Sequence, residues 1–89
     1  MSERGMVLYV LPREGSCRAG FMASRRVGGA VRRNRAKRRM REAWRAVAPG
    51  GGGGFDVVFA ARPDLADLTK PELIEQMRRG LERSGVWSR

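Results

Sequence analysis

Residues 25–45 read RRVGGAVRRNRAKRRMREAWR and contain ten of the nineteen Lys and Arg residues of the chain. They contain one acidic residue, Glu42, so the net charge of this segment is ten minus one, or +9. The other 68 of the 89 residues carry nine basic and eight acidic side chains, a net charge of +1. The overall charge of +10 is therefore concentrated in one segment, which is suited to binding a polyanion.

The same segment predicts a helix from about residue 30 to residue 47. It contains no proline, and Ala, Arg, Lys, Met and Glu are good helix formers. At 100° per residue, one arc collects the apolar side chains Ala36, Met40, Ala43, Trp44 and Val47. A stripe on the opposite side holds Asn34, Arg38, Arg41 and Arg45, with Arg33 and Lys37 near the border. We therefore expect a helix whose apolar side, Trp44 included, packs on a core while its cationic side binds the ligand.

Three strands are predicted around this helix. Residues 6–11 (MVLYVL) and 18–24 (RAGFMAS) read as strands, and the turn-like residues between them, with Gly15, suggest an antiparallel hairpin. Residues 55–61 (FDVVFAA) read as a third strand, after a glycine-rich connector at residues 50–54. Residues 1–5 read as a polar lead-in, residues 27–29 as a bend, and residues 64–70 as a polar loop.

A second helix is predicted from about residue 70 to residue 83. Thr69 is a candidate N-cap, Pro71 is near the first helical position, and Gly85 is a candidate C-cap. Its apolar stripe consists of Leu73, Ile74, Met77 and Leu81.

The predicted order is thus β-β-α-β-α within one domain over residues 1–89. The strand–helix–strand unit predicts a parallel strand pair beside the hairpin. Both helices can cover one side of a three-stranded sheet, so the fold class is α+β, a two-layer sandwich.

The composition argues against several functions. The chain has no histidine, so a Ser–His or Cys–His nucleophilic pair cannot form and the commonest nitrogen ligand of zinc is missing. The single cysteine, Cys17, excludes an internal disulfide and fits a cytoplasmic location. No apolar run approaches the ~20 residues of a membrane-spanning helix. We expect no catalytic group and no metal ligands on the protein.

Structured RNA is the polyanion that fits the basic helix best. A membrane helix needs a free apolar face, and here the core needs that face. DNA-binding patterns such as dimerising heptads, zinc ligands or a helix-turn-helix are missing. Arginines can bind clustered phosphates bidentately, and Asn34 among them can pair with base edges or a 2′-hydroxyl. We expect no membrane, DNA or protein partner.

Residues 25–45 also resemble the signature of the bacterial ribonuclease P protein subunit. In that family an Arg-Asn-Arg helix follows a Lys/Arg-Lys/Arg-Val-Gly-Asn-Ala-Val bend, and here Gly29 stands at the Asn position. The resemblance extends over residues 4–83, including residues 7–9, 20–24, 55–58 and 61–63. It implies a fold like ribosomal protein S5 domain 2, here without the family's usual first helix and strand.

The resemblance implies a role as well. Members of the family assist an RNA subunit that uses Mg²⁺, bound mainly by the RNA, to cleave the 5′ leader from precursor tRNA. The implied partners are the catalytic RNA and precursor tRNA, and the protein supplies no catalytic residue. The RNA-binding residues implied by the motif, with Arg45 added from the helical stripe, are Arg33, Asn34, Arg35, Lys37, Arg38, Arg41 and Arg45. The leader-binding residues implied are Tyr9, Ser24, Arg25, Arg33 and Lys37.

Three alternatives remain open on the sequence alone. A general structured-RNA-binding or ribosome-associated module would need the same basic helix. A nuclease in its own right would need grouped acids for Mg²⁺, for which Asp56, Asp64 and Asp67 are candidates. Tyr9 is equally well interpreted as a stacking platform for a leader base or as a sheet-packing residue.

Overall fold

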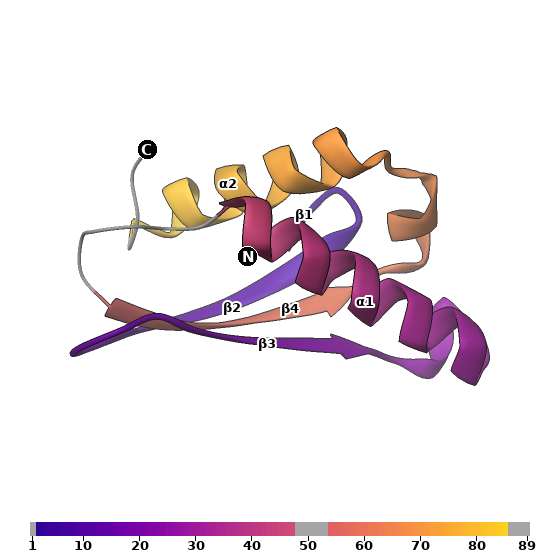
Figure 1. Ribbon diagram of the computed structural model, residues 1–89, viewed down its shortest axis with the longest axis horizontal. Helices are drawn as coiled ribbons and strands as arrows, with labels where there is room; N and C mark the ends of the chain where they lie inside the picture. Colours follow the sequence, from indigo (N-terminus) through magenta and orange to yellow (C-terminus); the bar gives the residue numbers. More distant parts are fainter. Residues whose placement is uncertain (1, 48–53, 86–89) are drawn as a thin grey trace.

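The computed structural model describes residues 2–47 and 54–85. The elements in chain order are β1 (Ser2–Glu3), β2 (Met6–Arg13), β3 (Arg18–Ala23), the 3-10 helix η1 (Arg25–Val27), α1 (Ala30–Val47), β4 (Gly54–Ala61), the 3-10 helix η2 (Pro63–Asp67) and α2 (Lys70–Ser84). Figure 1 shows the strands in one layer and both long helices on the same face of it. The α+β class and the two-layer arrangement are therefore confirmed.

The sheet order is β1-β2-β4-β3, which corrects the predicted hairpin. β4 lies between β2 and β3, pairing antiparallel with β2 and parallel with β3. The parallel pair joined through α1 is confirmed, but β2 and β3 are not neighbours. A physical reason is that β4 (GFDVVFAA) holds Phe and Val residues that favour a central strand, whereas β3 contains Ala19 and Gly20, which favour strands weakly.

A fourth strand, β1, corrects both the three-stranded sheet and the polar lead-in. Ser2 pairs with Val7 and Glu3 with Met6 in antiparallel register. Glu3 is buried, and its carboxylate accepts a hydrogen bond of 2.7 Å from Arg83 of α2. This charge pairing lets a polar dipeptide occupy a sheet edge. The expectation that no strand precedes residue 6 was therefore wrong.

Smaller corrections concern the connections. The 3-10 helix η1 precedes the expected bend and overlaps it at Val27, and η2 occupies most of the expected polar loop, with Leu65 buried. β2 continues through Pro12 to Arg13 instead of ending at residue 11. Of the glycine-rich connector, only Gly54 lies within the described residues, where it begins β4.

The predicted helices are confirmed closely. α1 spans Ala30–Val47, and α2 spans Lys70–Ser84. At the start of α2, the Thr69 hydroxyl accepts a hydrogen bond from the Glu72 backbone N–H, and the Glu72 carboxylate accepts one from the Thr69 N–H. Gly85 ends the helix in the left-handed conformation, with φ of 82°.

The core lies between the sheet and the two helices. Its fully buried large side chains include Phe55, Phe59, Met6, Leu8, Met40, Leu73, Met77 and Leu81. Trp44 packs at the side of this core, 5.5 Å from Phe59 and 6.4 Å from Phe55 between ring centroids. The prediction that Trp44 is a core residue is therefore confirmed.

Candidate nucleic-acid interface

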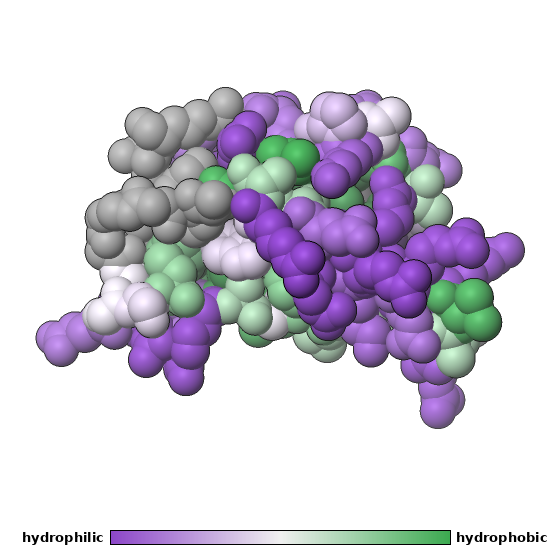
Figure 2. All heavy atoms as spheres, in the orientation of Figure 1, coloured by the Kyte–Doolittle hydropathy of each residue, from purple (hydrophilic) through white to green (hydrophobic). Residues whose placement is uncertain are grey.

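Helix α1 presents its cationic residues on three different sides. Met40 and Ala43 face the core, so the helical period fixes the direction of every other side chain. We call the solvent side the outer side, the side toward β3 the β3 flank, and the side toward η2 the η2 flank. The outer side holds Asn34, Arg38 and Arg45; the β3 flank holds Arg33, Lys37 and Arg41; the η2 flank holds Arg32, Arg35 and Arg39. In Figure 2 the hydrophilic side chains form a broad band over this helix.

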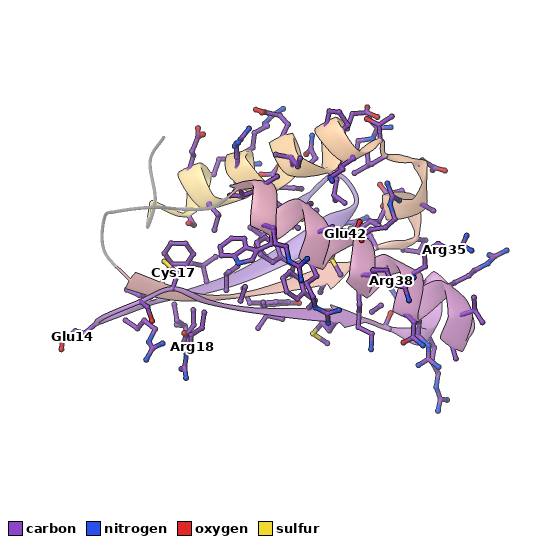
Figure 3. The ribbon with its side chains drawn as sticks, in the orientation of Figure 1. Glu14, Cys17, Arg18, Arg35, Arg38 and Glu42 are labelled. Atoms are coloured by element: carbon purple, nitrogen blue, oxygen red, sulfur yellow. The ribbon has the colours of Figure 1, made fainter. Side chains whose placement is uncertain are left out.

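The outer side contains three exposed members of the predicted RNA-binding set. Asn34, Arg38 and Arg45 are all exposed. None of them makes a hydrogen bond or an ion pair within the described part of the chain, and Figure 3 shows Arg38 on α1. Their donors are available to an external acceptor.

The β3 flank is packed more closely. The Arg41 guanidinium carbon lies 5.6 Å from the ring centroid of Phe21 on β3, a cation–π geometry that leaves the other face of the guanidinium exposed. Arg33 and Lys37 are half-buried, and the Nε of Arg33 is buried without a hydrogen-bond partner in the described residues. This corrects the single predicted stripe: Arg41 belongs with Arg33 and Lys37, above the edge strand.

The η2 flank contains a residue whose role the sequence did not reveal. The guanidinium of Arg39 donates a hydrogen bond of 3.0 Å to the carbonyl of Leu65 and another to the carbonyl of Leu68. Arg39 therefore joins α1 to the segment before α2. Its helical position, 60° from the buried Ala36, was the only signal that could have separated it from the exposed arginines. Arg35, assigned to the RNA-binding set, lies on this flank and is exposed.

The face of the sheet opposite the helices is open. Its exposed apolar side chains are Tyr9, Leu11 and Met22, with exposed fractions of 60%, 69% and 50%. In register, Tyr9 lies opposite Val58 of β4, which lies opposite Gly20 of β3. Side chains alternate along a strand, so Tyr9 points away from the buried Leu8. It therefore stands on the open face and is not a core residue.

Ser24 and Arg25 do not come together with Tyr9. They follow the end of β3, four residues beyond Gly20, or about 13 Å along the strand. The Ser24 hydroxyl accepts a hydrogen bond of 3.3 Å from the Arg26 N–H and caps η1, while Arg25 is exposed. Tyr9 therefore lies at one end of an elongated surface, and Ser24 and Arg25 lie at the other end.

An ion pair occupies one end of the open face. The Arg18 guanidinium donates two hydrogen bonds to the Asp56 carboxylate, of 3.0 and 3.1 Å, and Arg13 lies 3.6 Å from the same group. Figure 3 shows Arg18 on the side of the sheet away from the helices. The hydrogen bonds from Arg18 lower the pKa of Asp56 below its ordinary value.

The acidic residues considered for a nuclease are not grouped. Asp56 pairs with Arg18, and Asp64 lies 3.8 Å from Arg62. Residues 2–47 and 54–85 contain no group of three or more His, Cys, Asp or Glu side chains placed to hold a metal ion. Over the same residues, no helix is long and apolar enough to cross a membrane.

A basic helix laid over one face of a small mixed sheet defines a class of α+β proteins suited to polyanion binding. A family model described as Ribonuclease P matches residues 1–85, so the chain belongs to the ribonuclease P protein family. The chain is similar to the ribonuclease P protein component of Roseiflexus castenholzii, with 49% identity over 70 residues. It is also similar to that of Pelotomaculum thermopropionicum, with 40% identity over 87 residues.

These matches cover 78% and 97% of this chain, and 57% and 78% of the two relatives. The chain thus spans little more than half the length of the Roseiflexus protein. Among solved structures, the ribonuclease P protein of Staphylococcus aureus matches with a TM-score of 0.78 and 26% identity, covering 99% of this chain and 82% of that one. The Thermotoga maritima protein, solved with 1-(4-fluorophenyl)-2-thiourea, matches with a TM-score of 0.76 and 26% identity, covering 93% and 82%.

Proposed function

We propose that this chain acts as the protein subunit of ribonuclease P in the cytoplasm. In this role it binds the catalytic RNA and the 5′ leader of precursor tRNA and assists the 5′ maturation of tRNA. The observation that carries the proposal is the separation of α1 into an exposed cationic outer side and a flank that overhangs the edge strand beside the open sheet face. Membership of the ribonuclease P protein family supports it.

The outer side is assigned to the catalytic RNA. Arg38 and Arg45 bind phosphates, and Asn34 pairs with a base edge or a 2′-hydroxyl. Because these side chains make no hydrogen bond or ion pair within the described residues, RNA binding breaks no internal polar interaction of theirs. Neutralised phosphates allow RNA strands to approach one another, which lowers the concentration of Mg²⁺ that the RNA needs. In this proposal Mg²⁺ is bound mainly by the RNA, which carries out the cleavage.

The open face and the β3 flank are assigned to the leader. β3 is an edge strand, so a leader strand that passes around this edge can contact Lys37 on the β3 flank and then the open face. Tyr9 lies on that face on β2, with β4 between it and β3. Tyr9 offers an exposed ring on which a base can stack, a contact worth ~1–3 kcal/mol that tolerates any base. Ser24 and Arg25 extend the same path beyond the end of β3.

The test of the function is cleavage of precursor tRNA by the catalytic RNA at low Mg²⁺, with and without this protein. We expect the protein to raise the cleavage rate, and equal rates would contradict the proposal. Unrelated structured RNAs serve as competitors. If they compete as well as the catalytic RNA does, the chain is a general RNA-binding module instead.

Two variants test the assigned surfaces. Replacing Arg38 and Arg45 by Ala should flatten the salt dependence of RNA binding by up to ~0.7–0.9 in slope per lost phosphate contact.

The substitution Tyr9→Ala should weaken binding of leader-bearing substrate but not of leaderless tRNA. Tyr9→Phe keeps the stacking ring, so it should weaken neither. Equal losses for both tRNAs would remove Tyr9 from the leader path.

A further inference from the structure

Strand β3 leaves one side of its backbone unpaired. It is the last strand in the order β1-β2-β4-β3, and β4 is its only strand partner within residues 2–47 and 54–85. Half of its backbone N–H and C=O groups point away from β4, because these groups alternate in direction along a strand. No described residue forms a hydrogen bond with that side. The six residues of β3 make this free edge about 20 Å long.

The free edge also lacks the features that protect most exposed edges. Proteins usually shield such an edge with proline, lysine, a bulge or a covering segment. β3 reads RAGFMA, and its register with β4 runs without interruption from Arg18 to Ala23. Its only charged residue, Arg18, lies at the first position and pairs with Asp56. An edge of this kind is suited to accept a further strand.

Three cations of α1 stand above this edge in a regular row. Arg33, Lys37 and Arg41 form the β3 flank, and the Arg41 guanidinium lies over the ring of Phe21 on β3. α1 leads from the end of β3 back to the start of β4, so it runs back along the strand (Figure 1). Residues four apart on a helix are separated by about 6 Å along its axis, and alternate residues of a strand by about 6.7 Å. A strand added to β3 with an acidic residue at every second position therefore places one carboxylate near each cation.

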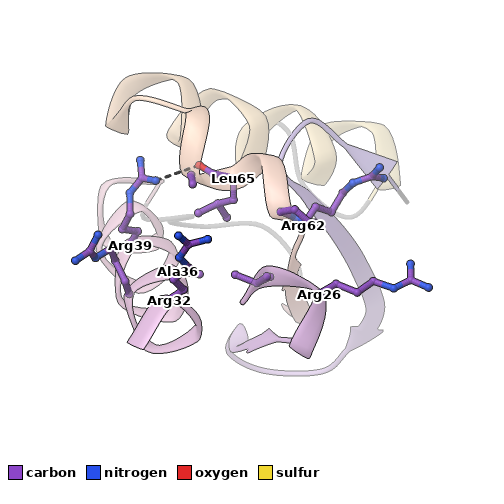
Figure 4. A pocket seen from close by; sticks show the side chains of 10 residues that line it. Arg26, Arg32, Ala36, Arg39, Arg62 and Leu65 are labelled. Carbon is purple, nitrogen blue, oxygen red and sulfur yellow. Dashed lines mark hydrogen bonds between the residues drawn. The ribbon is translucent and has the colours of Figure 1, made fainter. Parts of the chain in front are cut away.

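These three cations have no acidic partner in residues 2–47 and 54–85. None of the ion pairs of this part of the chain involves them. The opposite flank of α1, in contrast, is covered by the chain itself, since Figure 4 shows Arg39 reaching to the Leu65 carbonyl of η2. The β3 side of the molecule thus combines unpaired positive charge with an unpaired backbone edge.

We propose that the β3 edge binds an extended acidic segment of another protein, which adds a strand to the sheet. Main-chain hydrogen bonds to β3 hold the segment. Because side chains alternate along a strand, its acidic residues face Arg33, Lys37 and Arg41, and the residues between them lie beside Met22 on the open face. The inference goes beyond the proposed function, since the partner is a protein. The sequence alone indicated no protein partner, because the strand order that exposes β3 depends on long-range pairing.

Two other occupants fit the edge less well. A second copy of this chain, paired edge to edge through β3, brings two flanks of the same positive charge together. RNA phosphates accept hydrogen bonds but donate none, so they leave the outward carbonyls of β3 without donors. An extended peptide supplies donors and acceptors in the same alternation as β3 itself.

A short peptide of alternating Val and Glu (VEVEVEVEV) is the probe, and amide hydrogen exchange followed by NMR is the measurement. We expect alternate amides of β3 to exchange more slowly when the peptide is bound, while the amides of α2 stay unchanged. A peptide of the same composition with its Glu residues in one block should bind about tenfold more weakly, because it keeps the charge and loses the spacing. Equal affinity of the two peptides overturns the proposal. No RNA is present, so this result is independent of ribonuclease P activity.

N-methylated peptides separate strand addition from charge attraction. In the bound strand the N–H groups of the Glu residues point to one edge and those of the Val residues to the other. Methylation of one set removes the hydrogen bonds to β3, whereas methylation of the other set leaves them in place. We expect one methylated peptide to lose binding and the other to keep it. Binding by both or by neither contradicts the pairing with β3.

Variants of the flank test the charge. Lys37→Gln/Arg41→Gln should bind the alternating peptide about tenfold more weakly. Arg32→Gln/Arg35→Gln removes the same charge from the η2 flank and should keep the affinity. Lys37→Gln alone leaves the contact of Arg41 with Phe21 in place and should show a smaller loss. Equal losses in the two double variants would assign the binding to net charge and overturn the proposal.

A single-stranded oligouridylate tests the RNA alternative under the same conditions. We expect it to leave the exchange of the β3 amides unchanged, because its phosphates offer no strand-like pairing. If the oligonucleotide protects these amides as the peptide does, the edge is an RNA site and the proposal of a protein partner is wrong.

Discussion

The two faces of the sheet are built from the same strands but face different surroundings. On β4, Phe55, Val57 and Phe59 are buried under the helices, whereas Val58 and Ala60 face the open side and are half-exposed. β2 shows the same contrast, since its core-facing Met6 and Leu8 are buried while Tyr9 is exposed. The alternation of side chains along a strand thus separates two tasks. One face stabilises the fold, and the other can present residues to a ligand at little cost in stability.

The substitution Phe59→Ala should have the largest effect on stability. Phe59 is fully buried and contacts both Phe21 and Trp44, so its removal leaves a cavity and should cost ~3–5 kcal/mol of unfolding free energy. Urea unfolding followed by circular dichroism measures the loss. Tyr9→Ala is the matched control on the open face, with an expected change within ~0.5 kcal/mol. Equal losses would show that the open face is packed against something in solution.

The substitution Arg39→Met should have the next largest effect. It leaves the carbonyls of Leu65 and Leu68 without their donor, which should cost ~1–3 kcal/mol. Arg38→Met, the adjacent position on the outer side, removes the same charge and should change stability little. The same urea series compares the two. RNA binding should be weakened more by Arg38→Met than by Arg39→Met. If a fully folded Arg39→Met variant lost more RNA affinity than Arg38→Met, the assignment of the outer side to RNA would be contradicted.

The cap of α2 should have a smaller, pH-dependent effect. Thr69→Ala removes the hydroxyl that accepts from the Glu72 N–H and should cost ~1 kcal/mol. Hydrogen bonds from the Thr69 backbone and hydroxyl lower the pKa of Glu72 below its ordinary value of 4.5. Since the folded pKa is lower than the unfolded one, the stabilisation by this carboxylate is present above pH 4.5 and is lost as the pH falls through the folded pKa.

The measurement for the cap is the difference in unfolding free energy between the wild type and Glu72→Gln, taken from pH 7 downward. We expect the difference to shrink as the pH falls below 4.5. A difference that stays constant over this range would mean that the Glu72 charge does not contribute to the cap.

The smallest effect is expected at the Arg18–Asp56 pair on the open face. Both side chains are solvent-accessible, so Arg18→Gln should leave the unfolding free energy almost unchanged. The pKa of Asp56 should nevertheless rise toward its ordinary value of 3.8, because the hydrogen bonds from Arg18 are the main reason that this pKa is lowered. An NMR titration of the Asp56 carboxyl carbon tests this. A large loss of stability would mean that the open face contributes to folding as the covered face does.

Local sequence patterns predicted the helices well and the sheet poorly. Thr69, Pro71 and Gly85 mark the ends of α2 because capping involves neighbours in the sequence. The pairing of strands depends on residues far apart in the chain, and nothing local in residues 6–24 shows that β4 separates β2 from β3. The two-residue β1 is too short to have a periodic pattern of its own, and Glu3 is buried only because Arg83 approaches it.

Composition and a period of 3.6 residues were enough to predict the extent of α1, its charge, and which of its residues face the core. The contacts of each arginine in residues 25–45 depend instead on how distant segments pack against the helix. Arg38 and Arg39 are adjacent and chemically identical, yet one is exposed and the other is tied to two carbonyls. The difference arises because the segment after β4 passes along one side of α1, and a long-range approach of this kind cannot be read from the helix alone.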